Sequence, residues 1–164
     1  MTSPILAMLL GATALKVGEK APDFTLPDTD GQLVTLSRLL EKGPVILAFY
    51  PKAFTPGCTQ QNQNFRDHFG EVSAKGAQVV GISVDDVETQ RKFKEKYQLP
   101  FPLLSDKGGV VSEQYSGKMP LVGFAKRANI VVGEDGVVKA IVEGGGAVDP
   151  TSAIVSCPYR GKGS

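Results

Sequence analysis

The sequence predicts an α/β fold in which helices cover both faces of a mixed central sheet. Residues 44–50 form a continuous apolar run that is rich in β-forming side chains and typical of a strand buried on both faces, and the largely apolar run over residues 77–84 indicates a second buried strand. Capping and turn-forming residues separate these runs from helical stretches. The predicted order of elements, ββαβαβαββα, closes on a second hairpin and a short helix, which indicates one sandwich around one sheet.

The first half of the chain adds a β-hairpin in front of the sheet. Its arms alternate apolar and polar side chains, as strands at a sheet edge do, and flank a polar turn with a glycine. Ser37 is expected to cap the helix that follows the hairpin. In chain order we predict a strand over 21–27, a turn over 28–31, a strand over 32–36, a helix over 37–41, the central strand 44–50, a loop over 51–57 and a helix over 58–74.

The second half of the chain alternates strands and helices before a final hairpin. Asp85 and Asp86 are predicted to cap a charged amphipathic helix, and Asp149 with Pro150 forms an N-cap and first-turn pair for the last helix. Pro158 is expected to stop that helix. In chain order we predict a strand over 77–84, a helix to Tyr97, a strand over 101–104, a helix over 110–115, strands over 128–132 and 137–142, and a last helix after residue 150.

Length and composition are those of a single globular domain. The chain has 164 residues, of which 41% are hydrophobic and 21% are charged, and we divide it into an N-terminal extension over 1–15 and a domain over 16–164. The formal net charge of +1 and the lack of a basic run predict neither nucleic acid nor a membrane surface as a partner. No stretch approaches the roughly 18 apolar residues that a membrane span needs.

The start of the chain bears on its compartment. Residues 5–10 are apolar and residues 12–14 resemble a small-residue cleavage site, but no Lys or Arg precedes the apolar run and the segment is short for a secretory signal. We therefore expect a cytoplasmic protein, with plastid targeting and export as the alternatives.

Two cysteines and one histidine limit the chemistry of metal and disulfide sites. Cys58, Cys157 and His68 cannot fill a closed tetrahedral zinc site without a carboxylate, and no CxxC or HxxxH spacing occurs. A domain of this size does not need a disulfide framework. We therefore expect no metal and no cofactor, and a free, reactive thiol becomes the candidate for chemistry.

The loop from Pro51 to Gly57 places Cys58 where a buried strand ends and a helix begins. The first turn of a helix offers unsatisfied backbone N–H groups and the positive end of the helix dipole to an anion. Ligands of open α/β sheets also bind at the carboxyl ends of strands. The pattern therefore predicts a reactive thiolate at Cys58.

The helix terminus alone is too weak to ionise a thiol at neutral pH. An ordinary cysteine with a pKa of about 8.5 is only a few per cent thiolate at pH 7, and lowering that pKa to about 6 needs about 3.4 kcal/mol. A helix terminus supplies at most about 2 kcal/mol, so a cation must supply the rest. Arg127 is the leading candidate because a guanidinium offers a rigid fork of donors, and Lys52 and Lys126 are weaker ones.

Cleavage of a peroxide bond suits this set of residues. A thiolate attacks one oxygen while negative charge grows on the other, so hydrogen-bonding groups must converge on both. The Thr55 hydroxyl, the Cys58 backbone N–H and the Arg127 guanidinium can form this cradle. Pro51 carries no N–H, fixes the loop and shields the sulfur from water.

The spacing Pro51-x-x-x-Thr55-x-x-Cys58 resembles the signature of the peroxiredoxins, and its surroundings are similar to the bacterioferritin-comigratory or Q-type subfamily. The resemblance implies a thioredoxin-like fold with the N-terminal hairpin added. It also implies a thiol peroxidase with Cys58 as the peroxidatic residue and Pro51, Thr55 and Arg127 as its activating shell. The matching segments, within about residues 16–157, are 21–24, 49–59, 65–67, Arg127 and 135–136.

Three positions depart from the subfamily pattern. Gln63 stands where many Q-type members carry a resolving cysteine, Gln61 stands where an acidic residue is often found, and Gly133 stands where an aspartate is common. The first departure leaves Cys157 as the only other cysteine, in a region where some relatives keep a resolving one. Cys157 has three interpretations. It can react with the sulfenic acid of Cys58 to form a disulfide, pack as a small inert buried side chain, or pair with a cysteine of another molecule.

The leading hypothesis is a thiol peroxidase for hydrogen peroxide and organic hydroperoxides, reduced by thioredoxin or a similar thiol. We expect it to act as a monomer or a homodimer. The alternative is a non-enzymatic thioredoxin-fold redox sensor or chaperone that relays oxidation to a partner. A disulfide reductase is disfavoured by the missing CxxC motif.

Overall fold

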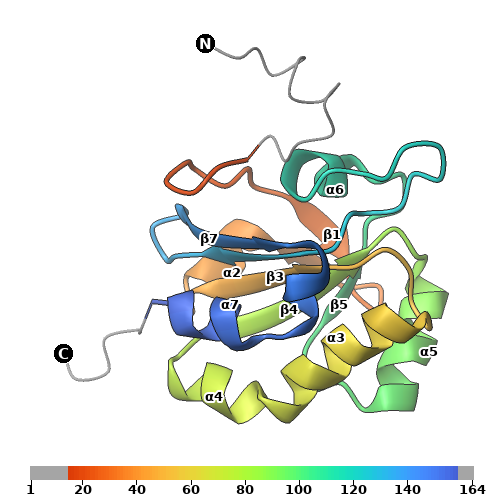
Figure 1. Cartoon of the computed structure of the whole chain (residues 1–164), viewed down its shortest axis with the longest axis horizontal. Helices are drawn as coiled ribbons and strands as arrows, with labels where there is room; N and C mark the ends of the chain where they lie inside the picture. Colours follow the sequence, from red (N-terminus) through yellow and green to blue (C-terminus); the bar gives the residue numbers. More distant parts are fainter. Residues whose placement is uncertain (1–14, 159–164) are drawn as a thin grey trace.

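The computed structural model describes residues 15–158, which build a five-stranded mixed sheet between two layers of other elements (Figure 1). The strands are β3 (Val45–Phe49), β4 (Gln78–Ser83), β5 (Leu103–Ser105), β6 (Ala128–Val132) and β7 (Val138–Glu143). They lie in the order β5-β4-β3-β6-β7. Because β3 pairs in parallel with β4 and antiparallel with β6, the first apolar run of the sequence is the central strand of the sheet.

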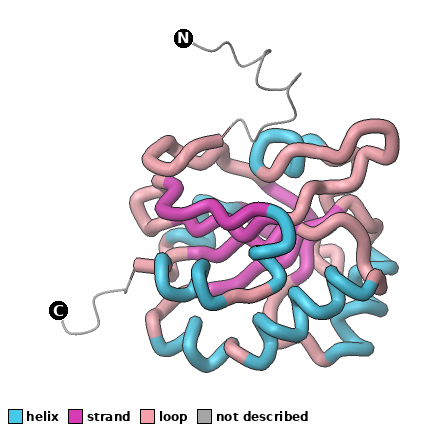
Figure 2. The backbone as a smooth tube through the Cα atoms, viewed as in Figure 1, coloured by secondary structure: helices cyan, strands magenta, loops and turns pink. Residues whose placement is uncertain are grey.

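Helices pack on both faces of this sheet, as the colouring of Figure 2 shows. One face carries α2 (Leu36–Leu40), α6 (Val110–Tyr115) and the hairpin of β1 (Thr25–Pro27) and β2 (Leu33–Thr35). The other face carries α3 (Pro56–Asp67), α4 (Phe69–Ala74), α5 (Val87–Tyr97) and α7 (Thr151–Ser156). A 3₁₀ helix, η1 (Gly144–Val148), connects β7 to α7.

The central strand β3 contributes side chains to two hydrophobic cores, one on each face of the sheet. Successive side chains of a strand point to opposite faces of its sheet, and every residue of β3 is buried. Leu47 and Phe49 belong to the cluster that contains Leu36 of α2, whereas Ile46 and Ala48 belong to the cluster built with α3, α4, α5 and α7. A continuous apolar run, with no polar alternation, is therefore what this position requires.

The predicted fold class is confirmed, and the largest difference among the strands is in the N-terminal hairpin. Its strands begin only at Thr25 and Leu33 and form a separate two-stranded sheet. Among the helices, α6 has the predicted bounds and Asp86 caps α5, its side chain accepting from the Thr89 N–H. The sequence prediction did not include η1.

The prediction of a Ser37 cap is wrong. Thr35 occupies the N-cap position of α2, and Ser37 lies inside the helix. Its hydroxyl donates instead to Asp23 Oδ2 at 2.9 Å, and its backbone N–H donates to Asp23 Oδ1 at 2.9 Å. The carboxylate of Asp23, from the preceding segment, therefore accepts hydrogen bonds from the first turn of this helix.

Two further helix boundaries differ from the prediction. The helix expected over 58–74 begins at Pro56 and divides at His68, whose φ of −105° and ψ of 12° leave helical geometry, so α3 and α4 are separate helices. The last helix has Pro150 at its N-cap, one residue later than expected. Asp149 still serves it, because Asp149 Oδ1 accepts from the N–H of the first helical residue at 2.9 Å.

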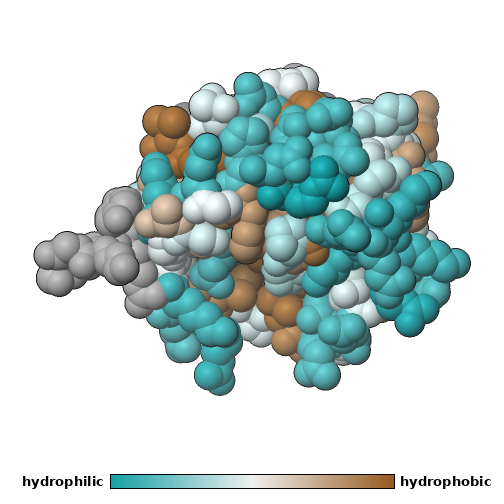
Figure 3. Space-filling view, turned by 90° about the horizontal axis from the view of Figure 1, so that it is seen from below, coloured by the Kyte–Doolittle hydropathy of each residue, from teal (hydrophilic) through white to brown (hydrophobic). Residues whose placement is uncertain are grey.

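The predicted extension over 1–15 lies outside the described residues except for Leu15, which is buried in the core on the hairpin face. Within the described range, no helix combines the length and the apolar character that crossing a bilayer requires. Figure 3 shows that the face seen from below is mostly hydrophilic and carries small, separate apolar patches.

We expect Leu47→Ala to lower the free energy of unfolding by about 2–5 kcal/mol, because Leu47 is fully buried at the centre of β3 and its truncation leaves a cavity. Leu33→Ala is the control: Leu33 is 73% exposed, and its loss should change that free energy by less than about 0.5 kcal/mol. Urea denaturation followed by circular dichroism measures both. Equal destabilisation by the two variants would contradict the central place of β3.

Candidate active site

Cys58 lies in the first turn of α3, just beyond the carboxyl end of β3. Thr55 is the N-cap residue with extended backbone, and Pro56 occupies the first helical position. A proline costs little there, since N–H groups of the first turn have no partner within the helix. The backbone N–H of Cys58 belongs to the same turn, so the local sequence turns unsatisfied donors and the positive helix end toward the sulfur.

Arg127 brings a cation to this sulfur. Arg127 Nη2 donates to Cys58 Sγ at 3.5 Å, and the cysteine is only 1% exposed. Gly57 leaves room for the guanidinium, because a Cβ there would lie 2.8 Å from Arg127 Nη2. Unit charges about 4 Å apart attract by about 4 kcal/mol at an effective dielectric constant of about 20. The predicted contact between the guanidinium and the sulfur is present in the structure.

A chain of buried amides holds Arg127 from the other side. Arg127 Nη1 donates to Gln61 Oε1 at 2.7 Å, and Gln61 Nε2 donates to Asn129 Oδ1 at 2.9 Å and to the Phe49 carbonyl at 3.3 Å. Asn129 Nδ2 donates to the carbonyl of Ala147 in η1 at 2.7 Å. Sequence reasoning noted Gln61 only as a departure and missed Asn129. The available signal was that Asn129 is a polar residue within the otherwise apolar, fully buried strand β6.

Thr55 occupies the N-cap position of α3, but its side chain makes no capping hydrogen bond. Its Oγ1 donates to the Lys52 carbonyl at 2.6 Å, so the hydroxyl proton is engaged and the oxygen lone pairs remain as acceptors. Asp85, predicted as a helix cap, anchors the same loop instead. Asp85 Oδ2 accepts from the Ala53 N–H at 2.7 Å and from the Ser83 hydroxyl at 2.6 Å.

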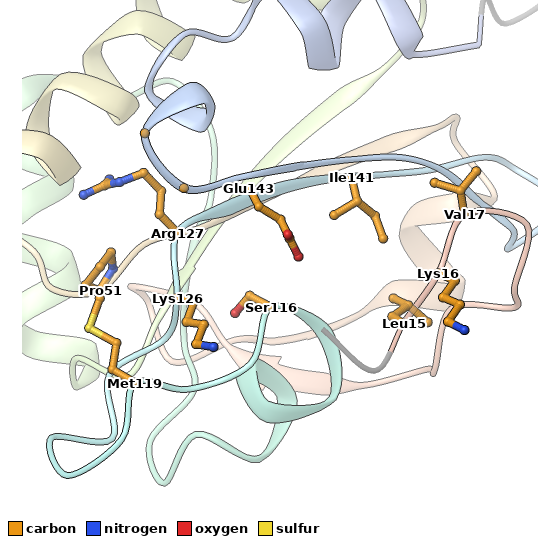
Figure 4. A pocket seen from close by; sticks show the side chains of 12 residues that line it. Leu15, Lys16, Val17, Pro51, Ser116, Met119, Lys126, Arg127, Ile141 and Glu143 are labelled. Carbon is orange, nitrogen blue, oxygen red and sulfur yellow. The ribbon is translucent and has the colours of Figure 1, made fainter. Parts of the chain in front are cut away.

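A cavity of about 810 Å³ opens beside the site (Figure 4). Pro51, Met119 and Arg127 lie near one end of it, and Val17 lies near the other. The volume is within the range of small-molecule sites. In the part of the chain that the structure describes, no group of three or more His, Cys, Asp and Glu side chains could hold a metal ion.

The structure does not bring Cys157 into this site. Lys75, just after α4, donates from Nζ to the Cys157 carbonyl at 3.3 Å. At about 1.5 Å per residue, the part of α3 from Cys58 to Asp67 alone spans roughly 14 Å. Figure 1 shows α7 beside α4, away from the start of α3. Because a disulfide needs Cα atoms within about 7 Å, a Cys58–Cys157 bond requires a large rearrangement.

The environment of Cys157 also keeps its thiol protonated. Burial raises the pKa of the Cys157 thiol to about 11, although the nearby Lys75 ammonium lowers it in part. The thiolate is the nucleophilic form of a cysteine. In the folded state Cys157 is therefore a poor nucleophile at neutral pH.

We expect Cys157 to react slowly with a thiolate-specific alkylating reagent at neutral pH. In a Cys58→Ser variant, in which it is the only cysteine left, the alkylation rate should rise about tenfold per pH unit until the pH reaches about 11. Mass spectrometry of timed samples measures the rate. A rate that levels off near a pH of about 8.5, the ordinary cysteine value, would contradict the buried placement.

Comparison with known proteins identifies the family to which the chain is similar. Residues 17–141 match the AhpC/TSA family. The chain is 44% identical over 134 residues to a bcp-type peroxiredoxin of Coxiella burnetii, covering 78% of this chain and 88% of that protein. It is 44% identical over 125 residues to peroxiredoxin Q, chloroplastic, of Oryza sativa subsp. japonica, covering 76% of this chain and 57% of the rice protein.

Among solved structures, the crystal structure of peroxidoxin BcpB from Mycobacterium tuberculosis matches with a TM-score of 0.82 and 39% identity, over 87% of this chain and 96% of that one. The fold, the sequence similarity and the family match all lead to the same group of proteins. The chain belongs to the AhpC/TSA family, and its relatives are peroxiredoxins of the bcp and Q types.

Proposed function

We propose that this protein is a thiol peroxidase that reduces hydrogen peroxide and organic hydroperoxides at Cys58. Membership of the AhpC/TSA family supports this activity. The observation that carries the residue assignment is the 3.5 Å contact between Arg127 Nη2 and Cys58 Sγ in the first turn of α3. This is the arrangement that a thiolate nucleophile requires.

The first half-reaction is a displacement at oxygen. The Cys58 thiolate attacks one peroxide oxygen, the oxygen–oxygen bond breaks, and its electron pair goes to the other oxygen. That oxygen takes a proton and leaves as water or an alcohol, while the sulfur, oxidised by two electrons, remains as a sulfenic acid.

The surrounding groups each act on a defined atom. The Arg127 guanidinium and the N–H groups at the start of α3 stabilise the negative charge on sulfur and on the departing oxygen. Thr55 Oγ1, whose own proton goes to the Lys52 carbonyl, accepts a hydrogen bond from the peroxide O–H and orients it. Pro51 presents no N–H to compete for the peroxide oxygens.

The cavity beside the site supports organic hydroperoxides as substrates in addition to hydrogen peroxide. Pro51 and Arg127 line it, and so do the apolar side chains of Met119 and Ile141. Because Arg127 both lines the cavity and contacts Cys58 Sγ, we expect an apolar substituent of a hydroperoxide to be buried there. Pockets with mainly apolar walls and a few oriented polar groups are typical of small-molecule sites.

The second half-reaction uses a thiol reductant, thioredoxin or a similar protein. One route is direct attack of that thiol on the sulfenic acid, and the other passes through a Cys58–Cys157 disulfide. The position of Cys157 beside Lys75 and its raised pKa favour the first route, because the thiolate is the attacking form. Both cysteines are free, which fits a reducing compartment such as the cytoplasm; the plastid is the alternative that the rice relative suggests.

Stopped-flow oxidation of the reduced protein by hydrogen peroxide tests the proposed activity. We expect the wild type to react at least about a hundredfold faster than free cysteine thiolate, because each oriented hydrogen-bond donor contributes about 10²–10³ in rate. Cys58→Ser should abolish the fast phase. A wild-type rate equal to that of free cysteine thiolate would instead support a redox sensor without a tuned site.

Mass spectrometry under non-reducing conditions, after a single equivalent of peroxide, separates the two routes of reduction. We expect a sulfenic acid at Cys58 and an unmodified Cys157 thiol in the wild type, and the same product in Cys157→Ser. A Cys58–Cys157 disulfide in the wild type that is missing from Cys157→Ser would establish the two-cysteine route.

A further inference from the structure

The loop over residues 117–126 connects α6 to β6 and has no part in the reaction steps described above. We propose that this loop is the docking surface for the protein that reduces oxidised Cys58. The proposal rests on the proposed function, because it concerns the partner of the second half-reaction. It assigns to that partner an apolar patch bordered by acidic groups.

Access to the sulfur decides where a reducing protein binds. Cys58 is only 1% exposed, and Cys157 lies away from it, beside α4. In the direct route, the thiol of the partner therefore approaches through the end of the cavity that Pro51, Met119 and Arg127 line (Figure 4). Because Met119 belongs to the 117–126 loop, a protein that binds over this end of the cavity meets the loop.

The tip of the 117–126 loop presents apolar side chains that the fold does not bury. Leu121 is 107% exposed and Val122 is 58% exposed, and Pro120 before them is exposed as well. Single apolar side chains are common on protein surfaces, but three in succession beside a reactive centre form a patch. One loop is too small for a stable dimer interface, whereas the short-lived complexes of redox partners use small interfaces.

The backbone holds this tip in a defined conformation. Leu121 has a φ of 72°, in the left-handed region that a leucine rarely adopts. The Met119 N–H donates to the Phe124 carbonyl at 2.7 Å, and the Gly123 N–H donates to the Met119 carbonyl at 3.1 Å, so the turn is closed around Leu121. Strained residues of this kind are concentrated at functional sites. Here the strain keeps an apolar side chain in solvent.

The segment that carries Cys58 has the same feature. Phe54 has a φ of 68° and is 42% exposed. Among the described residues, Gln98 is the only other non-glycine residue with a positive φ. The Lys52 ammonium lies 5.7 Å from the centre of the Phe124 ring, which joins this segment to the 117–126 loop. Both segments beside the site therefore expose an apolar side chain from a strained backbone.

The charges of these two segments are positive. Residues 51–60 and 117–127 contain no acidic residue, and their cationic residues are Lys52, Lys118, Lys126 and Arg127. Two carboxylates of other segments are close by: Glu113 Oε2 lies 3.8 Å from Lys118 Nζ, and Glu143 lines the cavity. The remaining excess of positive charge favours a partner whose patch is bordered by carboxylates.

The test compares turnover with two reductants, thioredoxin kept reduced by its NADPH-dependent reductase and the small molecule dithiothreitol. Leu121→Asn removes the apolar side chain and keeps a residue that tolerates the left-handed backbone, so kcat/KM for thioredoxin should fall about tenfold. Turnover with dithiothreitol and the stopped-flow rate of Cys58 oxidation by hydrogen peroxide should not change. Leu33→Asn is the control: it makes the same substitution at an exposed position of β2 and should match the wild type.

Higher ionic strength should lower kcat/KM for thioredoxin and leave turnover with dithiothreitol unchanged. A kcat/KM for thioredoxin that does not change with ionic strength contradicts the acidic border of the partner.

Three results overturn the docking surface. They are a Leu121→Asn protein with the wild-type kcat/KM for thioredoxin, a fall in turnover that dithiothreitol shares, and a wild type that dithiothreitol reduces but thioredoxin does not. A wild-type dimer in sedimentation experiments that Leu121→Asn dissociates would also overturn it, and would assign the loop to a second copy of the chain. Failure of hydrogen peroxide to oxidise Cys58 in the wild type would instead overturn the proposed function.

Discussion

The contact between the Arg127 guanidinium and the Cys58 sulfur is the interaction on which the site depends, and the sheet makes it possible. Antiparallel pairing of β3 and β6 sets Phe49 opposite Ala128. The loop that leads into α3 and the residue that precedes β6 therefore lie at the same end of these two strands. A slip of one residue in this pairing would turn Arg127 to the other face of the sheet, so the register of two buried strands is also a condition of the chemistry.

The same contact explains why several weak effects are combined at one sulfur. A helix terminus stabilises an anion by at most about 2 kcal/mol, and the cation in contact with the sulfur adds to that effect. The cation must be held, because a freely rotating arginine loses orientation and charge to solvent. Gln61 and Asn129 hold it, Gly57 gives it space, and Asp85 anchors the loop that approaches the sulfur.

Local signals allowed the sequence to predict much of this structure. The unbroken apolar run of β3, the acidic cap of α5 and the Pro51, Thr55 and Cys58 spacing all act within a few residues of one another, so pattern alone reveals them. Arg127 was assigned through its chemistry and the family resemblance, and the structure places it at the sulfur.

What the sequence did not predict depends on contacts between distant segments. Asp85 has the composition of a helix cap, yet its carboxylate is used by a loop more than thirty residues earlier in the chain. The roles of Gln61 and Asn129 arise only when α3, β6 and η1 are packed together. The position of Cys157 beside Lys75 follows from how α7 docks near the end of α4, which no spacing of the two cysteines in the sequence could indicate.

The most direct test of the central claim is the rate at which hydrogen peroxide oxidises Cys58 at neutral pH, measured by stopped flow in Cys157→Ser and in Cys157→Ser with Arg127→Gln. With Arg127 in place, we expect oxidation to be about a hundredfold faster or more, because one oriented donor at the reacting atoms contributes about 10²–10³ in rate. Equal rates in the two proteins would contradict the claim that the Arg127 guanidinium activates this sulfur.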